Sequence, residues 1–349
     1  MNARITRRAL LMSTLPAMAQ AQGFAGLGAG SAGFAEPQPE PSFTFPADHG
    51  PHPDFRIEWW YVTANLEGPD GTPYGIQWTL FRSALSTEGG SGWATPQAWL
   101  GHAALTTPDL HVATERLARG GIGQAGVDVD PFDAWIDEWR MSGPTLSEVR
   151  LTASGRDFAY DLALSADRPF VPQGAGGYSV KSAEGQASYY YSQPFYTVGG
   201  QLTLPSGNVA VTGRAWLDRE WSSSPLAETQ TGWDWFSLHF AGGEKLMGFR
   251  LRETSGASFT SATWIEADGT PTPFEDGAFS AEPLDETTVA GRAVPTRWRV
   301  RLPARGLNAE VGAINSMAWN DLLYSYWEGP VRVSGSHEGT GYLEMTGYE

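Results

Sequence analysis

The chain has 349 residues, a formal net charge of −16 and no cysteine. Its length suggests two domains of ordinary size, and the lack of cysteine excludes disulfides and thiolate zinc sites. The acidic balance argues against nucleic acid as a partner, because such a chain is repelled by phosphate backbones. The content of 15 Trp, 12 Tyr and 16 Phe indicates packed sheets, a flat apolar pocket, or both.

Residues 1–21 are predicted to be a Tat-type export signal. Arg7 and Arg8 precede a short apolar run that ends in small residues near Ala19. The run is too short to span a bilayer, and a tethering helix is the alternative interpretation. Residues 22–42 are rich in Gly, Ala, Pro, Glu and Ser, which predicts a flexible lead-in. We therefore expect a periplasmic or secreted chain that is soluble after removal of the signal.

From Phe43 onward, period-two alternation predicts strands. In the first half, strands are expected at 55–66, 74–83, 99–106, 135–140, 150–154 and 158–165. The segment 168–185 is rich in Pro and Gly, and we place a domain boundary there, near residue 180. The two expected domains are residues 43–180 and 181–349.

The second half repeats this alternation. Strands are expected at 200–204, 208–216, 233–240, 245–252, 258–266, 297–302, 326–334 and 341–347. No long window shows the pattern and caps of an amphipathic helix. Short strands joined by Gly and Pro turns predict an all-β, antiparallel fold built from closed barrels or sandwiches.

Several motifs together resemble one bacterial family. The motifs are FPADHG (45–50), FRIEWWY (55–61), ASYYYS (187–192), VTGRAWLDREWS (211–222), GWDWF (232–236) and YWEG (326–329). They resemble the secreted lipocalin-like family of AttH type, whose members are often labelled predicted secreted hydrolases. That family is similar to the carotenoid 1,2-hydratases, also called hydroxyneurosporene synthases. The resemblance covers residues 43–349 and implies two lipocalin-like β-barrel or β-sandwich domains packed together; in distant relatives the pocket lies at the domain junction.

One expected strand carries candidate chemistry. Alternation places Trp216, Asp218 and Glu220 on the same face. A carboxyl group in apolar surroundings has a raised pKa and can protonate an alkene, while aromatic rings stabilise the resulting cation. Similarity to the hydratases makes Asp218 the candidate proton donor, with Glu220 beside it. The alternative is a structural carboxylate paired with Arg214 or Arg219.

The sequence departs from the family pattern at Arg219, where many members have His. Arginine stays protonated and cannot act as a general base, so any mechanism that uses that His is in doubt here. His239 shares a face with Trp233 and Trp235 and could replace the missing base. The alternative is a structural histidine held by hydrogen bonds.

A second polar group lies near the start of the first domain, around Asp48, His49 and His52, with Glu58 following. Its spacing matches no standard zinc pattern, so a hydrogen-bonded plug is favoured over a metal site. Glu58 is the first-domain counterpart of Asp218, and it needs an arginine partner if it points inward. The residues expected to bind ligand are Glu58, Trp60, Tyr190, Trp216, Trp233 and Trp235.

The predicted function is that of an exported lipocalin-like protein that holds an elongated apolar ligand, lipid or isoprenoid-like, in a barrel or inter-domain cavity. The alternative is a hydro-lyase that hydrates an isolated double bond with Asp218 as acid. A third hypothesis, secreted hydrolase activity, lacks an identifiable nucleophile, because the sequence has no Gly-x-Ser-x-Gly elbow and no HExxH motif. No cofactor or metal is expected. A membrane or transporter partner in the envelope remains open, as does the oligomeric state.

Overall fold

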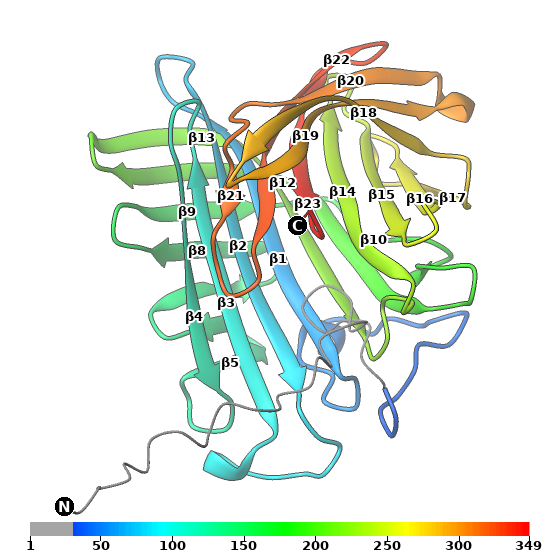
Figure 1. Cartoon of the computed structure of the whole chain (residues 1–349). Coiled ribbons are helices and arrows are strands. Elements are labelled where there is room, and N and C mark those ends of the chain that lie inside the picture. Colours follow the sequence, from blue (N-terminus) through cyan, green and yellow to red (C-terminus); the bar gives the residue numbers. More distant parts are fainter. Residues whose placement is uncertain (1–30, 349) are drawn as a thin grey trace, which may run out of the picture.

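The computed structural model describes residues 31–348. The predicted export signal and the first part of the predicted lead-in lie outside these residues. The described chain forms two curled antiparallel sheets, here called sheet A and sheet B, that lie side by side (Figure 1). One sheet closes almost into a barrel and the other forms a half-barrel, which confirms the predicted all-β, lipocalin-like fold.

Sheet A has 13 strands and contains the first strands of the chain. In spatial order its main path is β4 (His111–Arg119), β3 (Gln97–Thr106), β2 (Pro73–Ala84), β1 (Ile57–Glu67), β13 (Gly207–Ser222), β12 (Ala187–Leu204), β9 (Ala159–Ser165), β8 (Glu148–Ser154), β7 (Trp139–Thr145), β6 (Phe132–Ile136) and β5 (Ala125–Val129). Off this path, β10 (Val171–Pro172) and β11 (Tyr178–Val180) pair with β12.

Sheet B has 10 strands and is coloured yellow-green to red in Figure 1. Its order is β17 (Pro271–Phe274), β16 (Ser258–Ile265), β15 (Lys245–Glu253), β14 (Gln230–Phe240), β23 (Gly339–Met345), β22 (Tyr326–Gly335), β20 (Leu307–Ala313), β19 (Arg292–Leu302) and β18 (Ser280–Val289), with β21 (Trp319–Asn320) paired to β22. Short 3-10 helices occupy Ala47–His49, Gly92–Ala94 and Pro303–Arg305. Within residues 31–348, no helix is long and apolar enough to cross a membrane.

The chain passes from sheet A to sheet B after β13. The long hairpin of β12 and β13 follows the boundary expected near residue 180, yet it pairs with β1 on one side and β9 on the other. The change of sheet therefore falls between Ser222 and Gln230. As a result, the strand that carries Asp218 is a central strand of sheet A.

One expected strand is wrong. Residues 135–140 form a tight hairpin instead, because β6 ends at Ile136 and β7 begins at Trp139. Asp137 lies between them with a φ of 51°, the left-handed conformation of a turn residue. Ile136 pairs directly with Trp139, so only two residues separate the strands. The alternating patterns of the two strands therefore follow each other closely and look like one strand in the sequence.

Three apolar clusters hold the molecule together. One fills the curl of sheet A around Trp60 and Trp78, and a second fills sheet B around Trp298 and Trp327. The third joins the sheets and includes Tyr61, the residue after Trp60. Because successive side chains of a strand point to opposite faces, β1 contributes to a core on each side. Strands β1 and β13 are therefore a shared wall between the interior of sheet A and the junction with sheet B.

Candidate active site

A cavity of about 190 Å³ lies at the junction of the two sheets. Its wall on sheet A comes from β1, β2, β3, β12 and β13, and its wall on sheet B comes mainly from β14, β15 and β23. Most of the lining is aromatic or aliphatic. An apolar cavity of roughly 150 Å³ is large enough for benzene, so this cavity can enclose a ring system or a short branched chain.

Much of the sheet A wall lies along two rows of side chains that run across neighbouring strands. The first row is His102, Thr79, Tyr61, Asp218 and Ser192, each a direct partner of the next. The second row is Leu100, Phe81, Trp59, Glu220 and Tyr190. Directly paired residues point to the same side of a sheet with Cβ atoms about 5 Å apart, so strand register sets the order of groups along the wall.

The sheet B wall has a matching row. Phe249 pairs with Trp235, Trp235 with Glu344, and Glu344 with Glu328. Trp235 and Tyr61 meet edge to face across the junction, with ring centroids 5.3 Å apart. Trp235 Nε1 also donates to the Tyr190 hydroxyl at 3.3 Å. These contacts join the two sheets around the cavity.

Asp218 is buried at the cavity wall and has neutral hydrogen-bond partners. Ser192 Oγ donates to Asp218 Oδ1 at 2.5 Å, and Trp216 Nε1 donates to the same oxygen at 2.7 Å. In the part of the chain that the structure describes, Asp218 takes part in no ion pair. Burial raises the pKa of Asp218 to about 7, although these hydrogen bonds act in the opposite direction. The group is therefore able to give and take a proton near neutral pH.

Glu220, two residues further along β13, has a different environment. Lys181 Nζ lies 2.8 Å from its Oε1, and the Ser188 hydroxyl donates to the same atom. The ammonium group of Lys181 also lies 4.5 Å from the centre of the Phe249 ring. Glu220 thus lines the cavity as one half of a buried ion pair, so Asp218 is the better acid of the two.

Two further acids complete the site. Glu344 lines the cavity and accepts a hydrogen bond from Trp233 Nε1 at 2.5 Å. Burial raises the pKa of Glu344 to about 7. Glu328 lies behind this wall, where its Oε1 accepts from the Tyr61 hydroxyl at 2.5 Å. Burial raises the pKa of Glu328 well above its usual range, and the neighbouring Glu344 raises it further.

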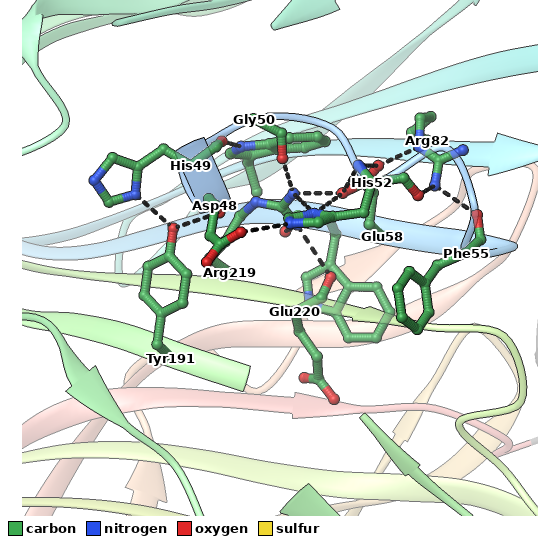
Figure 2. Close-up of polar contacts among 12 residues, drawn as sticks. Asp48, His49, Gly50, His52, Phe55, Glu58, Arg82, Tyr191, Arg219 and Glu220 are labelled. Atoms are coloured by element: carbon green, nitrogen blue, oxygen red, sulfur yellow. Dashed lines mark hydrogen bonds and ion pairs between the residues drawn. The ribbon is translucent and has the colours of Figure 1, made fainter. Parts of the chain in front are cut away.

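The opposite face of β1 and β13 carries a fully paired carboxylate. Glu58 forms ion pairs with Arg82 and Arg219, and the His52 amide donates to its Oε1 at 2.9 Å (Figure 2). His52 also lies within 3.3 Å of Asp48, which gives the hydrogen-bonded plug favoured from the sequence. Figure 2 also shows the carboxyl group of Glu220 directed away from this cluster.

The structure brings together five of the predicted site residues at the cavity: Asp218, Glu220, Tyr190, Trp233 and Trp235. Trp216 contributes its hydrogen bond to Asp218. Glu58 and Trp60 lie on the opposite face of β1, where Trp60 packs under the Arg219 guanidinium at 3.8 Å. That face is not part of the junction cavity, because Trp59 rather than Trp60 pairs directly with Glu220 and so points to the same side as Glu220.

His239 is also displaced from the cavity. It is buried edge to face against the Trp216 ring, with centroids 5.6 Å apart, and is absent from the cavity lining. Burial and the nearby Lys245 lower the pKa of His239 well below its usual value. The geometry therefore gives it no contact with a molecule in the cavity.

Several cavity residues were not identified from the sequence. They are His102, Lys181, Tyr326 and Glu344. His102 and Glu344 lie in expected strands with only the alternation that many strands of the chain share, Tyr326 begins the YWEG motif, and Lys181 lies in the Pro- and Gly-rich segment 168–185. No group of three or more His, Asp or Glu suited to a metal ion occurs within residues 31–348.

Two curled antiparallel sheets with an aromatic cavity at their junction define a lipocalin-like, two-sheet β protein. The family model that matches the chain is AttH-like and spans residues 36–348. The chain therefore belongs to the AttH-like family.

One solved structure supports this assignment, and two more distant ones share the fold. An AttH protein from Nitrosomonas europaea is 33% identical, with a TM-score of 0.81 over 90% of this chain and 100% of that one. Kievitone hydratase from Nectria haematococca is similar at 15% identity, with a TM-score of 0.67 over 90% of this chain and 96% of that one. CghA, solved with Sch210972, is 13% identical, with a TM-score of 0.57 and coverage of 92% and 97%. No curated protein sequence matches the chain.

Proposed function

We propose that the protein is a hydro-lyase that adds water to, or removes water from, a double bond of an apolar molecule held in the junction cavity. The observation that carries the proposal is Asp218, a buried carboxyl group at an aromatic cavity wall with neutral partners and a pKa of about 7. A carboxylate that served only to stabilise the fold would be expected to have a cation beside it. The fold shared with kievitone hydratase supports the same class of reaction.

In the proposed hydration, protonated Asp218 transfers its proton to one carbon of the double bond. The adjacent carbon becomes a carbocation, and the rings of Trp59, Trp235 and Tyr190 face the space that it would occupy. Water then forms the new carbon–oxygen bond and releases its second proton to a base. Dehydration is the reverse sequence. The aromatic wall matters because it stabilises positive charge without offering a nucleophile.

The second candidate is a carrier that binds an elongated apolar ligand without turnover. It is favoured by the mostly aromatic and aliphatic lining and by the partly exposed rings of Trp59, Phe81 and Tyr324 around the cavity. With a cavity volume of about 190 Å³, only part of a long chain would be held inside. The two candidates share the ligand class and differ in whether Asp218 transfers a proton.

We also propose that the chain is exported, with residues 1–21 removed. The support is the Arg7-Arg8 pair followed by a short apolar run. Mass spectrometry of the mature protein from a periplasmic fraction tests this proposal. A mature chain that begins close to residue 22 is the expected result, and an intact N-terminus in the cytoplasmic fraction would contradict it.

The test of the hydro-lyase uses oxygen-18-labelled water and a total lipid extract of the native host. We expect the wild-type protein to incorporate labelled oxygen into an extracted lipid, as detected by mass spectrometry. Asp218→Asn should retain binding of the same lipid and lose at least roughly 100-fold in incorporation, the usual contribution of a general acid. Asp109→Asn, at an exposed position, is the matched control and should behave as wild type. Lipid binding with no label incorporated by either protein would establish the carrier instead.

A further inference from the structure

Glu328 and Glu344 face each other across two neighbouring strands of sheet B. They are direct partners in the pairing of β22 with β23, so both side chains point to the same side. Two negative charges at directly opposed positions destabilise a sheet. The arrangement therefore favours a state in which at least one of the two carboxyl groups carries a proton.

Among the described residues, the surroundings of Glu328 contain hydrogen-bond donors but no cation to offset a second charge. The Tyr61 hydroxyl donates to one oxygen at 2.5 Å, and Asn320 Nδ2 lies 3.4 Å from the other. In the described part of the chain, neither Glu328 nor Glu344 takes part in an ion pair. The nearest groups on β13 are acids as well, because Asp218 and Glu220 both raise the pKa of Glu344.

We propose that Glu328 and Glu344 hold one proton between them and form a second acid–base centre of the cavity, in addition to Asp218. Glu344 lines the cavity and would be the general base for water. Glu328 lies behind it and would be a positioning residue that keeps Glu344 oriented and limits the total charge. This inference rests on the proposed hydro-lyase function.

The two centres divide the protons of the hydration step. Asp218 gives its proton to carbon, and the cation gains the water oxygen. The second proton of that water passes to the Glu344 carboxylate, so Asp218 ends deprotonated and Glu344 protonated. Transfer of this proton back to Asp218, directly or through water, restores the starting state. The sum is one water added across one double bond.

The connection between the centres is Tyr61. Its hydroxyl donates to Glu328, and its backbone position pairs directly with Asp218 on β13. Tyr326, which also lines the cavity, contacts His102 Nδ1 at 2.9 Å. Two tyrosines thus stand between the buried Glu328 and the cavity, where each can fix a side chain without introducing charge.

Titration of the pair is governed by a defined set of groups. Glu344 is faced by Asp218 and Glu220 from β13 and by Trp233 from β14. Glu328 is faced by Glu344 and Tyr342 from β23, Tyr61 from β1, Tyr160 from β9, Asn320 from β21 and Tyr326 from β22. The ammonium group of Lys181, which lies beside Glu220, is already paired with the Glu220 carboxylate. Deprotonation of the second member of the pair is therefore opposed by every acid that faces it.

Infrared difference spectroscopy of the full-length protein tests the pair without any substrate. Carboxylic acid and carboxylate groups have distinct carbonyl bands, and an ordinary Glu is fully ionised above about pH 6. We expect the wild type to keep one carboxylic acid band above about pH 8, where Asp218 and Glu344 have lost their protons. Glu328→Gln should remove this band, and Glu344→Gln should shift its titration to lower pH. Glu228→Gln, at an exposed loop position, is the matched control and should leave the band unchanged.

The shared-proton hypothesis is wrong if the wild type shows no carboxylic acid band above about pH 8, or if the band persists in Glu328→Gln. An unchanged titration in Glu344→Gln would show that the two groups are not coupled, which also overturns the proposal. If Glu328→Gln does not fold, the Glu344→Gln titration alone decides. The labelled-water assay distinguishes failure of this proposal from failure of the proposed function. If the wild type shows the shared proton but incorporates no labelled oxygen, the hydro-lyase function is rejected. If Glu344→Gln incorporates as much labelled oxygen as the wild type, Glu344 is not the general base.

Discussion

The two faces of the β1–β13 wall treat buried acids in opposite ways. On the face inside sheet A, Glu58 is completely buried between Arg82 and Arg219. On the face toward sheet B, Asp218 is equally buried but has only Ser192 and other neutral donors. Arg219 and Asp218 are adjacent in the chain, so one step along a strand separates a compensated charge from an uncompensated one.

This difference separates an acid that stays ionised from one that can exchange a proton near neutral pH. Burial alone would raise the pKa of Glu58, but the two guanidinium groups hold it well below its usual value, so the group remains a carboxylate. Burial raises the pKa of Asp218 to about 7, because no cation opposes it within the described chain. Equal burial therefore gives a fixed charge on one face and a transferable proton on the other.

The largest expected effect is on the paired face. Glu58→Gln leaves Arg82 and Arg219 buried without their carboxylate, which should lower the free energy of unfolding by about 3–5 kcal/mol. Denaturant unfolding at neutral pH measures this loss. Glu67→Gln, at the exposed end of the same strand, is the matched control and should change little. A loss below about 1 kcal/mol in Glu58→Gln would show that the two faces are not different in the way described.

A smaller effect sharpens the comparison from the junction side. Ser192→Ala removes one hydrogen bond to Asp218, at a cost of about 1 kcal/mol in the free energy of unfolding. Since this bond favours the ionised form, its loss should raise the pKa of Asp218 further. The measurement is the titration of Asp218 by infrared spectroscopy. Ser188→Ala, which removes the corresponding donor of Glu220, should leave that titration in place; equal shifts in both variants would contradict the account.

The fold and half of the site could be predicted from the sequence. Alternation placed Trp216, Asp218 and Glu220 on one face of β13, and the structure confirms that arrangement. The same reasoning could not tell which face of β1 is level with that face of β13. The strand register decides this, because Trp59 rather than Trp60 pairs directly with Glu220. A shift by one residue exchanges the faces, and the sequence of one strand does not contain its partner's register.

The acids of sheet B show a second limit of the sequence. Glu328 lies in one of the recognised motifs, and Glu344 lies in the last expected strand, residues 341–347. Their opposition depends on the pairing of β22 with β23, and their meeting with Asp218 depends on the packing of the two sheets. Neither relation has a local signal. Acids that become a site only through packing can be found only in the folded chain.

The dependence of stability on pH tests the central contrast most directly. In the unfolded chain Asp218 titrates near about pH 3.9, and in the folded chain its pKa is about 7. The folded state therefore binds the proton more tightly, and the stability that this proton gives is lost as the pH rises between these two values. Glu58 has the opposite sign, because its depressed pKa adds stability that is lost on acidification.

Denaturant unfolding of wild type, Asp218→Asn and Glu58→Gln, compared at about pH 4 and about pH 8, is the decisive measurement. Between the lower and the higher pH, we predict that the free energy of unfolding of Asp218→Asn rises by a few kcal/mol relative to that of wild type. Over the same change, the free energy of unfolding of Glu58→Gln should fall relative to that of wild type. If Asp218→Asn were destabilised equally at both pH values, Asp218 would be an ordinary ionised carboxylate. The assignment of the junction face to proton transfer would then be wrong.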